Sequence, residues 1–115
     1  MTGSLEAGNE AAKKVQKTPN RVDLQRLYDK IAATEWISPA LCPTMTICVL
    51  RLENGFTLVG KSAPADPANF NEDLGKQFAR DDAIRQMWPL EGYLLRETLW
   101  LESADDATGK GPNES

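Results

Sequence analysis

Runs of hydrophobic residues between positions 45 and 62 predict a β-hairpin. Thr46–Leu52 is rich in residues that favour strands, and Phe56–Gly60 follows it. Asn54 and Gly55 stand between the two runs, and both tolerate the positive φ that a two-residue type I′ turn requires. Both faces of such a hairpin carry hydrophobic residues, so we expect both to be covered. The turn predicts that Glu53 faces Phe56 and that Leu50 faces Val59.

Hydrophobic residues at helical spacing predict three helices. The first covers Val22–Ala33, the second runs from Asn71 to Met87, and the third runs from Pro89 to Leu101. Pro89 interrupts the last two, which we expect to form a helical hairpin. A short extended piece is expected at Glu35–Ile37. The predicted fold class is therefore α+β: an N-terminal helix, a small antiparallel sheet and a helical hairpin.

Segments poor in hydrophobic residues flank this pattern. Residues 1–20 are predicted to be a flexible N-terminal segment, and residues 103–115 a disordered tail. Residues 21–102 then form a single α+β domain. Its predicted helices carry more apolar surface than so small a core can bury, which favours a homo-oligomer. The residues expected at that interface are a row of small side chains and two leucines: Gly75, Ala79, Ala83, Leu95 and Leu99.

Composition excludes several kinds of chemistry. The chain has 115 residues, a net charge of −4, two cysteines and no histidine. Without histidine, the commonest general base and the commonest metal ligand are both missing, and two cysteines do not complete a structural zinc site. We therefore expect a binding protein rather than an enzyme, with no metal and no cofactor. The acidic balance argues against direct nucleic-acid binding, and no apolar run is long enough to cross a membrane.

Basic residues near aromatic residues are the candidates for ligand binding. An arginine beside an aromatic ring can hold a phosphate and a nucleobase together. Asp81 and Arg85 lie four residues apart within an apolar stripe, so they form either a structural ion pair or a ligand contact. Lys76 and Arg80 are also four apart and repel each other unless an anion lies between them. Arg96 is a further candidate.

The central block of the chain contains a set of short motifs: Thr46-Ile-Cys48, Asn54-Gly-Phe56, Gly60-x-Ser62, Asp66-Pro-Ala-Asn-Phe-Asn71, Gly75, Ala79, Ala83 and Trp88-Pro-Leu-Glu-Gly-Tyr93. Together these motifs resemble a family of small tailed-phage proteins, named after gene product forty-nine of one phage and gene product sixty-six of another. The chain departs from the family's usual residues at Ala63-Pro64 and at Arg80–Asp82.

The block is also similar to the first-described anti-Thoeris sponge proteins. That resemblance implies a phage-encoded oligomer that sequesters a cyclic nucleotide or cyclic ADP-ribose-type immune signal between protomers without cleaving it. It places the protein in the host bacterial cytoplasm, with the signal nucleotide and further copies of itself as partners. The ligand residues expected on these grounds are Asn69, Phe70, Asn71, Lys76, Arg80, Arg85, Trp88 and Arg96.

A second function fits the same composition. A small acidic protein with apolar faces can inhibit a host defence complex by binding it directly, as anti-CRISPR proteins do. The partner would then be a host defence protein rather than a nucleotide.

Overall fold

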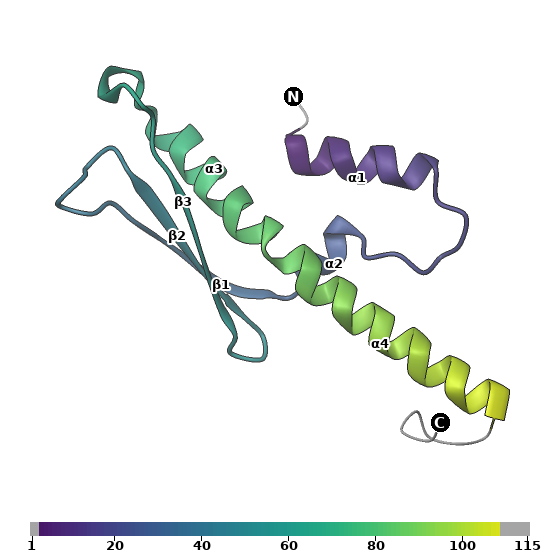
Figure 1. The fold of residues 1–115 in the computed structure, drawn as a ribbon. Coiled ribbons are helices and arrows are strands. Elements are labelled where there is room, and N and C mark those ends of the chain that lie inside the picture. Colours follow the sequence, from purple (N-terminus) through teal and green to yellow (C-terminus); the bar gives the residue numbers. More distant parts are fainter. Residues whose placement is uncertain (1–2, 109–115) are drawn as a thin grey trace.

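The protein is a three-stranded antiparallel sheet with a long bent helix across it and two N-terminal helices beside it (Figure 1). The computed structural model describes the backbone of residues 3–108 and the side chains of residues 3–104. The sheet order is β1-β2-β3. The elements are α1 (Ser4–Lys14), α2 (Leu24–Asp29), β1 (Ile31–Ile37), β2 (Thr46–Leu52), β3 (Thr57–Ser62), the short 3-10 helix η1 (Pro67–Asn69), α3 (Glu72–Arg85) and α4 (Met87–Thr108). The α+β class is confirmed.

The N-terminal segment is a helix rather than the flexible arm that its sequence suggested. Leu5 of α1 is buried in the core, and Asn9 is buried beside it. The Asn9 side chain accepts hydrogen bonds from the backbone N–H of Leu24 and from Arg21. These contacts attach α1 to the segment that leads into α2.

The helix expected over Val22–Ala33 is only six residues long. It begins after Asp23, whose side chain accepts a hydrogen bond from the N–H of Gln25, and it ends at Asp29. Ile31 already pairs with Leu52 of β2, so strand pairing replaces the last helical turn. The extended piece expected at Glu35–Ile37 is part of this longer strand.

The hairpin is confirmed, but its register differs by one residue from the prediction. Leu50 faces Leu58 rather than Val59, and the N–H of Leu52 donates to the carbonyl of Phe56. Among the described residues only Gly55 has positive φ, at +89°, so Asn54 does not adopt the conformation that a type I′ turn needs. The turn therefore has three residues instead of two.

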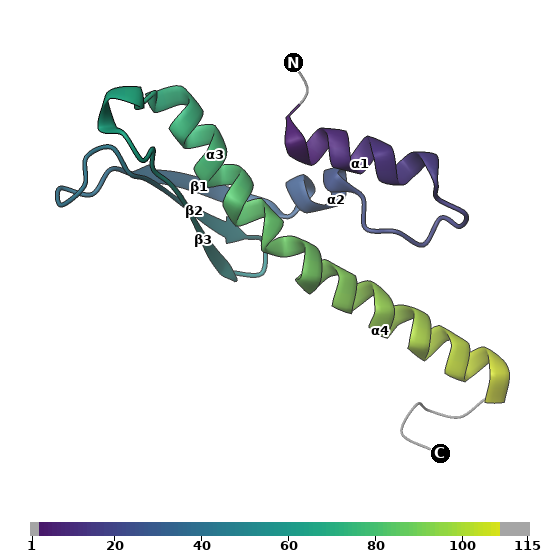
Figure 2. The ribbon, with the colours of Figure 1, turned by 45° about the horizontal axis from the view of Figure 1, so that its top comes forward.

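This register gives the sheet one buried face and one open face. Cys48, Leu50 and Leu58 all point toward α3 and are buried. On the other face Val59 is 54% exposed, and within the described part of the chain no helix covers it (Figure 2). Within a single chain, the predicted cover is therefore present on the face that carries Cys48 and Leu50, and it is missing from the face that carries Val59.

The last two helices form one bent rod instead of a helical hairpin (Figures 1 and 2). The bend falls at Gln86, which keeps right-handed helical dihedral angles. Pro89 lies in the first turn of α4 and has no N–H to donate to the carbonyl of Arg85, so it loosens the helix without reversing it. The helix then continues to Thr108, past the predicted end at Leu101. Of the tail predicted to be disordered, residues 109–115 lie outside the described residues.

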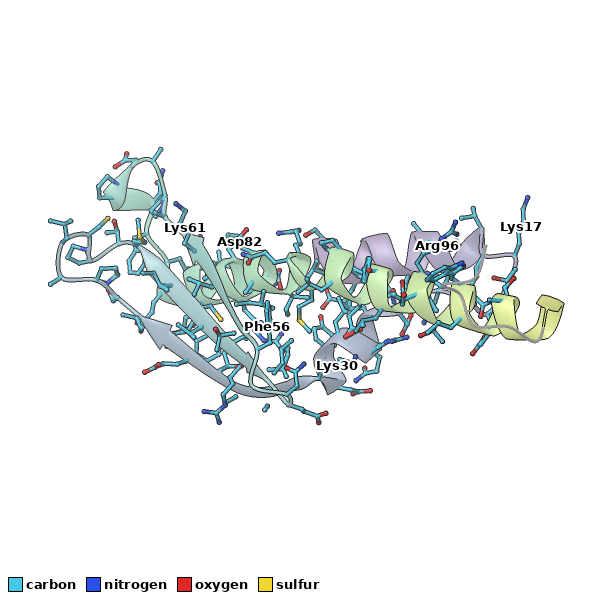
Figure 3. The ribbon with its side chains drawn as sticks, turned by 60° about the horizontal axis from the view of Figure 1, so that its bottom comes forward. Lys17, Lys30, Phe56, Lys61, Asp82 and Arg96 are labelled. Carbon is cyan, nitrogen blue, oxygen red and sulfur yellow. The ribbon has the colours of Figure 1, made fainter. Side chains whose placement is uncertain are left out.

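The outer edge of β3 is hydrogen-bonded by a side chain of α3 and by the side chain of Gln86 at the bend. The backbone N–H of Lys61 donates to Oδ2 of Asp82 at 3.0 Å, and Figure 3 shows these two residues side by side. The side-chain amide of Gln86 donates to the carbonyl of Val59 at 2.7 Å. The helix thus lies along the edge of the sheet as well as on its face.

Candidate functional site

The ligand-binding residues predicted from the sequence fall in separate regions of the molecule. Asn69, Phe70 and Asn71 lie at the start of α3, whereas Arg85 lies at its end. A helix of 14 residues is about 21 Å long at 1.5 Å per residue, so the two groups do not share a site within one chain.

The hollow beside Arg85 combines a cation and an aromatic ring. It lies between α1 and the junction of α3 with α4, has a volume of about 430 Å³, and is called the Arg85 hollow below. Its lining comes from two segments that are far apart in the sequence, residues 4–22 and residues 85–88. The lining residues are Ser4, Leu5, Gly8, Asn9, Ala12, Arg21, Val22, Arg85 and Trp88.

Arg85 has no carboxylate partner in this hollow. Its guanidinium donates a hydrogen bond to the hydroxyl of Ser4, and no described carboxylate lies within 4.0 Å of it. The ion pair with Asp81 that the sequence left open does not form within 4.0 Å: Asp81 is buried and Arg85 is exposed, and the charge of Arg85 only partly offsets the rise that burial causes in the pKa of Asp81. Arg85 is therefore available to an anion.

The second arginine of the hollow has a structural role. Nη1 of Arg21 lies 3.0 Å from Oδ1 of Asp23, and Nη2 donates to the backbone carbonyl of Asn9 at 2.9 Å. The hydrogen bond from Arg21 lowers the pKa of Asp23. Arg21 thus fixes one wall of the hollow, while Arg85 keeps its charge unpaired.

Lys76 and Arg80 are engaged with aromatic rings of their own chain. The guanidinium of Arg80 lies 5.1 Å from the centre of the Tyr28 ring. Nζ of Lys76 lies 5.9 Å from the centre of the Trp36 ring and 3.5 Å from Oε1 of Glu72. These cation–π contacts hold both residues against the body of the domain, apart from the Arg85 hollow.

A hydrogen bond between Tyr28 and Glu6 attaches α1 to α2 beside Arg80. The Tyr28 hydroxyl donates to Oε1 of Glu6 at 2.7 Å. This bond lowers the pKa of Glu6, while burial and the same bond raise the pKa of Tyr28 to about 12. Burial and the nearby charge of Glu6 also raise the pKa of Asp81. The contact between α1 and α3 is thus rich in coupled charges.

A smaller hollow of about 220 Å³ lies at the start of α3 and includes Asn69, Phe70 and Asn71. The side chain of Asn71 accepts a hydrogen bond from the N–H of Leu74 and so caps the helix. Its amide oxygen therefore accepts a structural bond. These three predicted residues line one hollow, which is separate from the Arg85 hollow.

The row of small residues expected at an interface between copies is buried within the chain itself. Ala79 and Ala83 are fully buried, and a Cβ placed on Gly60 of β3 would lie 2.1 Å from the carbonyl oxygen of Ala79. Gly75 packs against Thr46 in the same way. The interface prediction is wrong for these three residues of α3, because their small side chains let α3 approach its own sheet. Leu95 packs partly against the core, and Leu99 is half-buried.

A groove on the other side of α4 was not predicted. It has a volume of about 390 Å³ and lies between the hairpin turn and the first turns of α4; it is called the Tyr93 groove below. Its floor holds Glu91, whose side chain is 5% exposed and forms an ion pair with Lys30. Nη2 of Arg26 lies 3.6 Å from Oε2 of the same carboxylate. The sequence signal was present, because Glu91 shares the inward helix face with Leu95. The lining residues are Lys30, Leu52, Glu53, Asn54, Phe56, Leu90, Glu91, Tyr93 and Leu94.

Arg96 lies farther along α4 than either site. Figure 3 shows Arg96 well beyond Lys30 and Phe56, on the part of α4 that has left the sheet. It is exposed and borders a shallow surface with Glu97 and Trp100. It therefore does not join Arg85 within one chain.

Two classes of site are missing from the described residues. None of the helices in residues 3–108 is long and apolar enough to span a membrane. In the same part of the chain, no three cysteine or acidic side chains gather as metal ligands would.

Comparison with known proteins identifies the family. No curated protein and no solved structure matches the chain. The model of the phage protein (N4 Gp49/phage Sf6 gene 66) family matches residues 8–99. This range includes the whole sheet, the groove and the smaller hollow, and all of the Arg85 hollow except Ser4 and Leu5. The chain therefore belongs to this family of phage proteins.

Proposed function

We propose that this phage protein binds and sequesters a cyclic nucleotide or cyclic ADP-ribose-type immune signal without cleaving it, and so antagonises bacterial immunity. The observation that carries the proposal is the unpaired guanidinium of Arg85 in one hollow with the indole of Trp88. An arginine binds phosphate oxygens by paired hydrogen bonds, and an indole face stacks on a nucleobase. In the proposed complex, the Ser4 hydroxyl gives up its bond to Arg85 when a phosphate takes its place.

Sequestration requires affinity and no chemical step. The chain has no histidine to serve as a general base, and the proposed ligand contacts are a cation, an aromatic ring and a hydroxyl. Such contacts stabilise a bound anion without activating a nucleophile. The protein would act in the host bacterial cytoplasm, as a homo-oligomer, by lowering the free concentration of the signal.

Titration calorimetry with cyclic ADP-ribose isomers and with cyclic di- and trinucleotides tests this proposal. We expect one of these compounds to bind and to be recovered intact when the protein is denatured. Arg85→Ala should weaken binding at least tenfold, because it removes the unpaired cation. Arg51→Ala is the matched control, since Arg51 is exposed on β2 and lies outside the hollow. Binding of none of these compounds, or equal losses in the two variants, would overturn the proposal.

A protein-binding inhibitor of a host defence complex is the second candidate. The net charge of −4 and the open sheet face around Val59 favour it, because both suit a protein surface. Capture of a host defence complex by the tagged chain, with no nucleotide shifting its melting temperature, would select this function over sequestration.

A further inference from the structure

The Tyr93 groove has apolar walls above a charged floor. Phe56 of the hairpin and Tyr93 of α4 are both in its lining, and each ring is about half-exposed or more. Figure 3 shows Phe56 and Lys30 near each other beside the first turns of α4. A hollow that joins aromatic and leucine side chains to a few polar groups is typical of a site for a small molecule.

The size of the groove limits what it can hold. Its volume of about 390 Å³ lies near the lower end of the roughly 300–1,000 Å³ that ligand pockets span. A cavity of about 150 Å³ is enough for one benzene molecule. The groove therefore has room for a two-ring compound or a short alkyl chain with one polar head group.

The floor presents a hydrogen-bond donor to such a head group. Nζ of Lys30 donates to Oε2 of Glu91 at 3.0 Å and also contacts Oε1, and the Lys30 side chain is 35% exposed. An ammonium group carries three N–H donors, and those described for Lys30 go to Glu91 alone. One donor therefore remains for a ligand, on an ammonium that the buried carboxylate holds in place.

The floor also carries one positive charge in excess. Arg26 lies 3.6 Å from the carboxylate of Glu91, so Lys30 and Arg26 share a single negative charge. Excess charge beside apolar walls attracts an ion of the opposite sign. Glu53 is the other acidic residue in the lining, but it is exposed on the hairpin turn, where water and salt screen its repulsion of an anion.

We infer that the Tyr93 groove binds a small apolar carboxylate, an aryl or alkyl acid of about two rings in size. The ligand carboxylate accepts the remaining hydrogen bond of Lys30, and its apolar body lies between Phe56 and Tyr93. The site is distinct from the proposed nucleotide site, because none of the residues that line the groove lines the Arg85 hollow.

The charge of the floor distinguishes a carboxylate from other head groups. An amine would meet the cations Lys30 and Arg26, and both oxygens of Glu91 already accept from Lys30. A neutral amide accepts the free hydrogen bond but leaves the excess charge unbalanced. A phosphate monoester carries about −1.5 to −2 charges at pH 7, more than one excess cation balances. A carboxylate carries the single charge that matches.

A series of ligands with one ring system and three head groups tests the inference. Titration calorimetry with indoleacetate, indoleacetamide and tryptamine compares an acid, an amide and an amine. We expect indoleacetate to bind at least tenfold more tightly than either of the others. It should shift the methyl resonances of Leu52, Leu90 and Leu94 in the groove, and not those of Leu5 in the Arg85 hollow.

Two outcomes of that series overturn the inference. Equal affinity for the three compounds would show that the groove recognises the indole ring without its head group. No binding of indoleacetate at millimolar concentration would show that the groove is not a carboxylate site, as when another protein surface fills it. Neither outcome bears on nucleotide binding in the Arg85 hollow.

Substitutions in the groove give the second test. The double variant Lys30→Met, Glu91→Leu removes the ammonium without leaving a buried carboxylate unpaired. It should weaken indoleacetate binding at least tenfold and leave indoleacetamide binding unchanged, whereas Tyr93→Ala should weaken both. Lys61→Met is the control, since Lys61 is exposed on β3 and lies outside the groove. Melting temperatures establish that each variant is folded. A double variant that still prefers the acid overturns the inference.

Discussion

Gly60 of β3 lies directly against the backbone of α3 at Ala79. A Cβ at position 60 would stand 2.1 Å from the Ala79 carbonyl oxygen and 2.5 Å from the backbone nitrogen of Ala83. Both neighbours are backbone atoms within a helix, so they cannot rotate away as a side chain does. The close packing of the helix on the sheet therefore depends on the missing side chain.

We expect Gly60→Ala to destabilise the protein by about 3 kcal/mol or more, because the helix must move off the sheet. Urea denaturation measures this loss. Gly92→Ala is the matched control: Gly92 lies within α4, and a Cβ there meets nothing within 4 Å. That substitution should stabilise the helix by about 0.5–1 kcal/mol. Equal effects of the two substitutions would contradict the packing described.

Removing the hydroxyl of Tyr28 should loosen α1. Tyr28→Phe deletes the hydrogen bond to Glu6 and should cost about 1 kcal/mol, with faster hydrogen exchange in α1 than in α3. Tyr93→Phe is the control, because Tyr93 is 68% exposed. Uniform exchange rates across α1 and α3 would show that the bond does not hold the helix.

The same pair predicts a pH dependence. The lowered pKa of Glu6 contributes stability above its ordinary value of 4.5, and this contribution is lost as the pH falls through the folded-state pKa. The raised pKa of Tyr28 contributes fully below pH 10.0 and is lost between pH 10.0 and about 12. The melting temperature of Tyr28→Phe should therefore change less with pH than that of the wild type in both ranges. Equal pH dependence of the two melting temperatures would contradict this account.

Neutralising Asp81 should stabilise the protein near pH 7. Burial raises the pKa of Asp81, so the folded state disfavours its ionised form. Asp81→Asn should raise the melting temperature at pH 7, and this gain should vanish below pH 3.8, where the carboxyl is protonated in both states. Glu35→Gln, at an exposed position of β1, should change little. A gain that persists at pH 3 would point to a cause other than charge.

The buried carboxylate of Glu91 depends on Lys30. Lys30→Ala should destabilise by about 2 kcal/mol, less than the roughly 3–5 kcal/mol of a fully buried pair, because Lys30 is 35% exposed and Arg26 remains nearby. The double variant Lys30→Met, Glu91→Leu should recover most of that loss. Lys17→Ala, at an exposed position without an ion pair among the described residues, is the control in the same denaturation series. No recovery in the double variant would contradict this account.

The sequence was most informative where one local feature determines the structure. Gly55 and the strand-forming residues around it located the hairpin, and Asn71 marked the start of α3. The register failed because it depended on Asn54 adopting positive φ, which no local pattern settles. The N-terminal helix was missed because its docking relies on Leu5 and on Asn9, whose bonding partners lie 12 and 15 residues away.

The candidate site was harder to predict than the fold. Helical spacing places Lys76, Arg80 and Arg85 on one helix, but it does not show which of them meet other elements. Lys76 lies over the ring of Trp36 and Arg80 over the ring of Tyr28, whereas Arg85 has no ion-pair partner among the described residues and lies in one hollow with Trp88. These outcomes depend on how α1, α2 and β1 pack against α3, and the sequence of α3 alone does not contain that information.

The bonds from Asp82 and Gln86 to β3 also determine how this sheet can grow. An edge strand with free backbone groups can pair with strands of other molecules and so promotes aggregation. In β3 the N–H of Lys61 and the carbonyl of Val59 are already hydrogen-bonded to Asp82 and Gln86. Strand addition is thereby directed to β1. The side chains of Asp82 and Gln86, which line neither hollow, thus protect the sheet from strand addition at β3.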